Sequence, residues 1–109
     1  MVNLSYKIWL EQEGKVFGKG PYELLKRTKE KGSLAEAAKS MEMSYNKAFN
    51  LIKAIEKKLG YKLLNSKRGG AVKGSSTLTL EAEELMFKYE AFIEECDVAL
   101  KKIFEKHFK

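Results

Sequence analysis

The spacing of hydrophobic residues changes along the chain, and it begins with a two-residue alternation. Over Leu4–Leu10 apolar and polar side chains alternate loosely, a pattern typical of a strand with one buried face. A Glu-Gly pair then offers a turn, after which Val16 and Phe17 are placed to pair back as a second short strand. We therefore predict a β-hairpin within residues 1–19.

The next segment predicts two consecutive helices with clear ends. Gly20-Pro21 opens the first helix, because proline is tolerated at the first helical position, and Gly32 is placed to stop it. Ser33 and Glu36 have the spacing of a capping box, in which a hydroxyl and a carboxylate each satisfy a free backbone N–H group. The second helix is short, and its apolar side consists of Leu34, Ala37, Ala38 and Met41.

A third helix is predicted between a cap at Ser44 and a stop at Gly60. Its apolar residues recur at spacings of three and four, which makes it amphipathic; they are Ala48, Leu51, Ile52, Ile55 and Leu59. The opposite side is basic and carries side-chain amides: Asn46, Lys47, Asn50, Lys53 and Lys57. We expect this side to face outward.

A second hairpin and a long helix complete the chain. Leu63 and Leu64 predict a short strand and residues 77–80 a returning one, joined by a basic, glycine-rich loop over residues 66–76. Thr79 can then cap a helix that runs towards Lys106. Its about 28 residues would span about 42 Å, which is longer than one small core requires.

This last helix carries a heptad-like seam that predicts a partner. Apolar residues recur at steps of three and four along it, with a flanking row beside them. We expect an antiparallel or crossed pair of these helices in a homodimer, and the alternative is a helix packed wholly within the monomer. The expected interface residues are Leu85, Tyr89, Phe92, Ile93, Cys96, Ala99 and Ile103.

Positive charge is concentrated in the middle of the chain. The net charge is +6, and residues 44–76 alone hold eight lysines or arginines against one glutamate. A polyanion such as nucleic acid is the first partner to consider. An anionic membrane surface is the second, and a solvated lysine-rich face without a partner is the third.

Length and composition limit the possible classes. A chain of 109 residues predicts one domain, since domains run to roughly 100 to 200 residues, and this excludes a multidomain enzyme. The single Cys96 excludes an intramolecular disulfide framework. The sequence contains no apolar run of about 18 residues, the length that a membrane-spanning helix needs. We expect a cytoplasmic protein.

Three helices followed by a basic hairpin predict a mainly α winged helix-turn-helix, with an N-terminal hairpin (residues 1–19), a helix-turn-helix and wing (20–80) and a long dimerisation helix (79–108). The major groove of DNA is about 12 Å wide and admits one helix, whose first turns face the base edges. An Asn amide can pair with adenine and a Lys with guanine or phosphate, so Asn46, Asn50 and Lys47 are candidates for reading sequence. Ser44 and Tyr45 lie beside them at the helix start and are also expected to contact the DNA, Tyr45 through a phosphate or a thymine methyl group.

Further cations are expected to hold the DNA backbone. Lys53, together with Lys57 and Lys58, sits along the third helix beyond the turns that reach bases, so we interpret these lysines as phosphate partners. Lys67, Arg68 and Lys73 in the wing loop would contact phosphates or the minor groove, the alternative being an ordinary surface loop.

The order and spacing of these motifs resemble a known regulator domain. The matching residues are Gly32-Ser33-Leu34, Ala37-Ala38, Ser44-Tyr45, Ala48, Ile52, Leu59-Gly60 and Leu78-Thr79. With the leading hairpin and the long last helix, they resemble the N-terminal DNA-binding domain of ModE-type molybdate-responsive regulators, and the frame is similar to the LysR-type winged helix.

The resemblance implies a homodimer that binds a palindromic site on double-stranded DNA and regulates transcription. In ModE proteins the dimer forms through the hairpin and long helix, and oxyanion sensing belongs to separate C-terminal domains. We therefore expect no cofactor and no small-molecule effector on this chain.

The remaining signals favour no other chemistry. Gly69–Ser75 superficially spells a phosphate-binding loop, but Ser75 stands where such a loop requires Lys. The lone His107 and the Cys96 thiol lack partners with catalytic or metal-ligand spacing, so we expect neither an enzyme nor a metal site. The alternative function is a winged-helix module that docks an acidic protein within a larger assembly.

Overall fold

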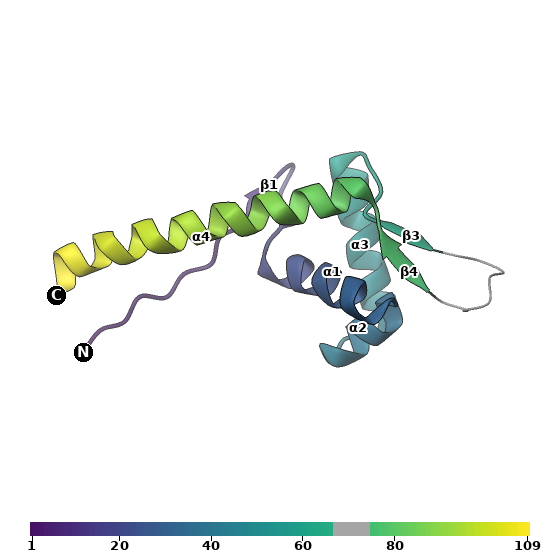
Figure 1. The fold of residues 1–109 in the computed structure, drawn as a ribbon, viewed down its shortest axis with the longest axis horizontal. Helices are drawn as coiled ribbons and strands as arrows, with labels where there is room; N and C mark the ends of the chain where they lie inside the picture. The colour runs from purple at the N-terminus through teal and green to yellow at the C-terminus, as the bar shows by residue number, and fades with distance from the viewer. Residues whose placement is uncertain (67–74) are drawn as a thin grey trace.

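The computed structural model describes residues 1–66 and 75–109, and it is mainly helical with two small hairpins. Three helices bundle at one end of the molecule, and a fourth extends far beyond them (Figure 1). In chain order the elements are β1 (Leu10–Glu11), β2 (Lys15–Phe17), α1 (Lys19–Lys31), α2 (Leu34–Ser40), α3 (Tyr45–Leu59), β3 (Leu64–Ser66), β4 (Ser76–Leu78) and α4 (Leu80–Phe108). The predicted winged helix-turn-helix architecture is confirmed.

The first hairpin is shorter than its sequence pattern predicts. The expected strand over Leu4–Leu10 is wrong, because only Leu10 and Glu11 pair with β2, through the partners Leu10–Phe17 and Glu11–Lys15. The physical reason is the length of the second strand: α1 begins at Lys19 directly after it, so the earlier residues have no ladder to join. They instead form an extended segment beside α4 (Figure 1).

Helix ends follow the predicted capping residues, with one shift. The Ser33 hydroxyl accepts the Glu36 backbone N–H at 3.2 Å, and the Ser44 hydroxyl accepts the Lys47 backbone N–H at 3.1 Å. The stop predicted at Gly32 is also confirmed, since this residue adopts the left-handed conformation at φ 74° that ends many helices. Helix α1, however, begins two residues before Pro21, at Lys19.

The core lies between the first hairpin, the three-helix bundle and the start of α4. Tyr89 of α4 is central to it: its ring meets Phe17 edge to face at 5.1 Å and lies 5.5 Å from the ring of Tyr22. Ala82 and Met86 of α4 are buried as well. The first three turns of α4 therefore belong to the core of their own chain.

Side-chain hydrogen bonds fix the helices relative to one another. Arg27 of α1 donates from its guanidinium group to the backbone carbonyl of Ser40 at 2.8 Å and to the Ser40 hydroxyl at 3.1 Å. It also pairs with Glu23 one turn earlier, at 3.2 Å. Because Ser40 is the last residue of α2, Arg27 ties α1 to the end of α2 where carbonyl groups lack helical partners.

The wing strands are anchored to the helices at both of their ends. The Ser76 backbone N–H donates to the Gly32 carbonyl at 2.9 Å, which joins β4 to the end of α1. Thr79 caps α4 by accepting the Ala82 backbone N–H at 3.0 Å, and its hydroxyl donates to the Lys62 carbonyl at 2.7 Å. The start of α4 and the base of β3 are therefore held together.

Helix α4 gives the molecule its elongated shape, with principal extents of 58 × 28 × 21 Å. Its second half projects away from the bundle together with the N-terminal segment, so both chain ends lie at the same end of the molecule (Figure 1). Helix α3 and the wing strands lie at the opposite end. Within the described residues, no helix is long and apolar enough to cross a membrane.

Candidate nucleic-acid interface

One side of α3 is exposed along its whole length and carries the predicted reading residues. Ala48, Ile52 and Ile55 are buried in the core, as their spacing predicts. The opposite side is exposed and carries Ser44, Tyr45, Asn46, Lys47, Asn50, Lys53 and Lys57. We call these seven residues the α3 outer face. The structure therefore brings together the helix residues proposed from the sequence.

The start of this face is held by a hydrogen bond. The Ser44 hydroxyl accepts the backbone N–H of Lys47, which fixes the helix start and leaves its O–H able to donate to a ligand. Asn46 and Asn50 lie one turn apart on the exposed side. Their amides are therefore presented from the first two turns of the helix, which are the turns that reach base edges in a docked helix-turn-helix.

Lys53 is more constrained than the other lysines of the face. Its ammonium group lies 3.3 Å from the carboxylate of Glu56 and 5.3 Å from the centre of the Phe49 ring. The Glu56 side chain is only 9% exposed, so one member of the ion pair is fixed. This carboxylate offsets part of the Lys53 charge. The Lys53 side chain therefore lies along the helix surface, between Glu56 and the Phe49 ring.

Lys58 does not belong to the α3 outer face. Its ammonium group donates to the backbone carbonyl of Lys15 at 3.1 Å, and the Lys58 carbonyl accepts from the side-chain amide of Gln12 at 2.5 Å. Both bonds join the end of α3 to the first hairpin. This contact directs the Lys58 ammonium group towards the first hairpin, and the interpretation of Lys58 as a phosphate partner stays a prediction.

The wing stands next to α3 because a buried carboxylate connects them. One oxygen of Glu56 accepts the backbone N–H of Leu63 at 2.7 Å and that of Leu64 at 3.3 Å. Strands β3 and β4 then pair in antiparallel register, with Leu64 opposite Leu78. The proposed wing cations Lys67, Arg68 and Lys73 lie outside the described residues.

Sequence reasoning missed Phe49. Its side chain is 39% exposed, and its ring stacks on Tyr45 with centroids 5.9 Å apart and an interplanar angle of 28°. The spacing of four residues between two aromatic side chains at the start of an exposed helix was a signal that could have found this pair.

The residues proposed for the dimer interface divide into two groups. Tyr89 is 6% exposed and lies in the core of its own chain, so it is not available to a partner, and Leu85 is half-buried beside it. Further along α4, Ile93 and Cys96 are half-buried, whereas Phe92, Ala99 and Ile103 are exposed. The apolar seam of α4 is therefore part of the protein's own core near the start of the helix and exposed further along it.

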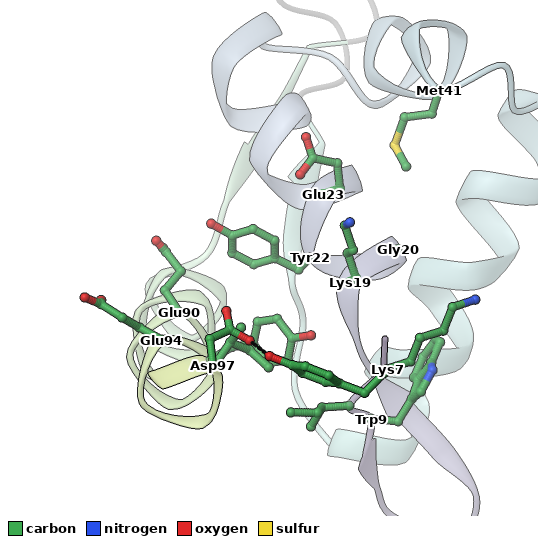
Figure 2. A pocket seen from close by; sticks show the side chains of 14 residues that line it. Lys7, Trp9, Lys19, Gly20, Tyr22, Glu23, Met41, Glu90, Glu94 and Asp97 are labelled. Atoms are coloured by element: carbon green, nitrogen blue, oxygen red, sulfur yellow. Dashed lines mark hydrogen bonds between the residues drawn. The ribbon is translucent and has the colours of Figure 1, made fainter. Parts of the chain in front are cut away.

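A groove of about 940 Å³ opens between the N-terminal segment, the start of α1 and the middle of α4 (Figure 2). Tyr22, Ile93 and Trp9 contribute apolar surface to it, and four carboxylates stand around it: Glu23, Glu90, Glu94 and Asp97. Asp97 accepts a hydrogen bond from the Tyr6 hydroxyl, which attaches the N-terminal segment to α4.

The acidic surroundings act on the phenols of the groove. The hydrogen bond to Asp97 is the largest influence on Tyr6 and raises the pKa of its hydroxyl. Burial, followed by the nearby Glu90 carboxylate, raises the pKa of Tyr22. Both shifts favour the neutral form of the phenol. Among the described residues, no three His, Cys, Asp or Glu side chains are grouped so as to hold a metal ion.

This combination of a bundled helix pair, an exposed amphipathic third helix and an anchored β-hairpin defines a winged helix-turn-helix protein. Residues 22–83 match the family model described as bacterial regulatory helix-turn-helix protein, lysR family. The chain belongs to this LysR family.

Solved structures agree on the fold. The chain in "Crystal structure of CbnR_DBD-DNA complex" is similar to this one with a TM-score of 0.63 and 18% sequence identity, over 81% of this chain and 95% of that chain. Its title describes a DNA-binding domain in complex with DNA. No curated protein matches this chain. The LysR-like frame expected from the sequence is confirmed.

Proposed function

We propose that this protein is a sequence-specific double-stranded-DNA-binding transcriptional regulator that acts as a homodimer with a ModE-like arrangement. The observation that carries the proposal is the α3 outer face: two amides and three lysines are exposed along one side of a helix whose other side is buried. Two comparisons support the same assignment. The similar structure named above is a DNA complex, and the chain matches the LysR family model.

The outer face divides into base-reading and backbone-holding parts. Asn46 and Asn50 project from the first two turns, where an amide can donate to and accept from one adenine edge. Lys47 lies beside them and suits guanine or a phosphate. Lys53 and Lys57 lie further along, where a docked helix leaves the groove floor and meets the phosphates. Lys67, Arg68 and Lys73 are proposed as wing contacts to the backbone.

Two connections would keep this surface rigid when it docks. Arg27 fixes the end of α2, the helix that precedes the reading helix, and Glu56 fixes the wing strands against α3. Rigidity matters because binding then costs less ordering of side chains and loops. The reading helix and wing are therefore presented as one unit.

Charge along α4 supports pairing with a second copy. Residues 81–97 hold seven carboxylates and one lysine, whereas residues 101–109 hold four lysines and one glutamate. An antiparallel partner helix would place its basic end beside the acidic stretch, with exposed Phe92 and Ile103 between the helices. We propose a dimer interface of Leu85, Phe92, Ile93, Cys96, Ala99 and Ile103.

In such a dimer, two α3 helices would enter successive major grooves about 34 Å apart and read a pseudo-palindrome. The ModE-like part of the proposal rests on the leading hairpin and the long last helix, which occur here together. The arrangement needs no cofactor and no effector on this chain, and it fits a cytoplasmic regulator.

The test is selection of bound duplexes from a random pool, followed by a salt titration of the selected and a random duplex. We expect a twofold-symmetric site, and log K should fall steeply with log salt because several phosphates are neutralised. Lys88→Ala is a matched control, because this lysine pairs with Glu84 on α4 at 2.9 Å, outside the α3 outer face. Its salt slope should equal that of the wild type.

The competing function is a module that docks an acidic protein. It predicts no selected sequence and no preference for duplex, and binding to a protein need not follow the salt dependence of phosphate contacts. Absence of duplex binding at about 50 mM salt, where phosphate contacts dominate, would reject the DNA assignment.

A further inference from the structure

Two aromatic rings border the α3 outer face, and the proposed polar contacts do not use them. Tyr45, Phe49 and Lys53 lie four residues apart along one side of the helix. The Tyr45 ring stacks on Phe49, and the Lys53 ammonium group stands 5.3 Å from the centre of the Phe49 ring on its next turn. The three side chains form a continuous stripe, and we call it the aromatic edge.

The position of Phe49 is restrained although the residue is exposed. Tyr45 contacts it from the preceding turn and Lys53 from the following one, and Lys53 is itself held by the buried Glu56. A ring supported on two sides has few rotamers to lose on binding, so a contact it makes costs little ordering. Phe49 is therefore built as a fixed apolar contact.

The aromatic edge lies between the amides and the wing. Phe49 and Glu56 are seven residues apart, which is about two turns, so they share one side of α3. Glu56 contacts the base of β3, and that side therefore faces the wing. Phe49 follows Asn46 by three residues, so the two side chains are neighbours on the helix surface. A helix that presents Asn46 to a base edge consequently brings Phe49 towards a neighbouring base on the wing side.

Only one group on the base edges of the major groove is apolar enough to pack against such a ring. The base edges present hydrogen-bond donors and acceptors, and the thymine 5-methyl group is the apolar exception. A phenylalanine ring has no polar atom, so it gains nothing from the polar groups, whereas it removes a methyl group from water. Resting on the proposed DNA-binding function, we infer that Phe49 reads the 5-methyl group of a thymine and that Tyr45 positions its ring.

The inference is tested on the selected duplex by replacing each thymine in turn with deoxyuridine, which deletes the methyl group and leaves base pairing intact. For the wild-type protein, one position in each half-site should cost about fourfold in Kd, the value of one buried methyl-sized group. That thymine should neighbour the base pair whose preference relaxes in Asn46→Ala. The other thymines should tolerate the change.

Two variants assign the effect to Phe49. Phe49→Ala should bind the thymine and deoxyuridine duplexes equally, because the apolar partner of the methyl group is gone. Phe49→Leu keeps an apolar side chain and should retain most of the discrimination. Circular dichroism and the salt slope on random duplex should be unchanged in both variants, which separates lost methyl contact from lost folding.

Each outcome decides the matter. Equal binding of every deoxyuridine duplex by the wild type overturns the methyl contact while leaving the DNA assignment intact. Unchanged discrimination by Phe49→Ala overturns the role of Phe49. If Phe49→Ala binds DNA as tightly as the wild type, the aromatic edge serves another partner, such as a protein. Failure of the wild type to bind any duplex overturns the proposed function and this inference with it.

Discussion

The carboxylate of Glu56 accepts the backbone N–H of Leu63 at 2.7 Å, so α3 and the residue that precedes β3 share a buried hydrogen bond. The same oxygen accepts from Leu64, and the other oxygen pairs with Lys53. One side chain therefore sets the position of the wing and also limits the movement of a lysine on the outer face. Its removal should affect both stability and binding.

Glu56→Ala should lower the free energy of unfolding by about 2 to 3 kcal/mol, because it leaves two backbone N–H groups near the core without an acceptor. Urea unfolding measures the loss. The matched control is Glu84→Ala, which removes an exposed i,i+4 ion pair with Lys88 and should cost at most about 0.5 kcal/mol. Equal losses in the two variants would contradict the role of Glu56.

Asn50→Ala and Lys57→Ala should separate base reading from backbone binding. Asn50→Ala should cost about 1 to 3 kcal/mol on the selected duplex and relax the preference at one base pair. Lys57→Ala should weaken all duplexes alike and lower the salt slope by about one. Competition titrations with the selected duplex and a random duplex measure both effects. An equal loss on both duplexes for Asn50→Ala would show that it does not read sequence.

Phe92→Asp should dissociate the proposed dimer, because it places a charge in an apolar interface. Light scattering gives the mass. Phe87→Asp is a sharp control: Phe87 is more exposed, at 74% against 44%, and points to another side of α4, five residues away. If the mass halves with Phe87→Asp and not with Phe92→Asp, two copies pair through the opposite side of α4.

Gly18→Ala should loosen the N-terminal segment. A Cβ atom at this position would lie 2.7 Å from the indole ring of Trp9, well inside normal contact. Trp9 is the single tryptophan, so its fluorescence should shift to longer wavelength as the ring moves into water. Gly20→Ala, where a Cβ atom meets nothing within 4 Å, should leave the emission unchanged and stabilise α1 slightly. Identical spectra for Gly18→Ala and the wild type would contradict the contact.

The elements that could be predicted from the sequence are those governed by short-range chemistry. The caps at Ser33, Ser44 and Thr79 involve a hydroxyl and a backbone group three residues later, so neighbouring residues suffice to recognise them. The buried side of α3 likewise follows from a local period. These features fix the helices and, with them, the outer face.

The errors arise where the outcome depends on a distant partner. The alternation over Leu4–Leu10 fits a strand, but the period does not show whether a second strand is long enough to pair with it. Tyr89 fits the heptad seam of α4, and the seam does not reveal that Phe17 occupies that side of the helix.

Both ends of the polypeptide lie together, at the far side of the molecule from α3 and the wing strands (Figure 1). An affinity handle or dye attached through a flexible spacer to either end would therefore stand clear of α3. A chip or bead that captures the protein by such a handle would leave this helix turned towards solution. Tethered formats should consequently report the same affinity as free protein, whichever end is fixed.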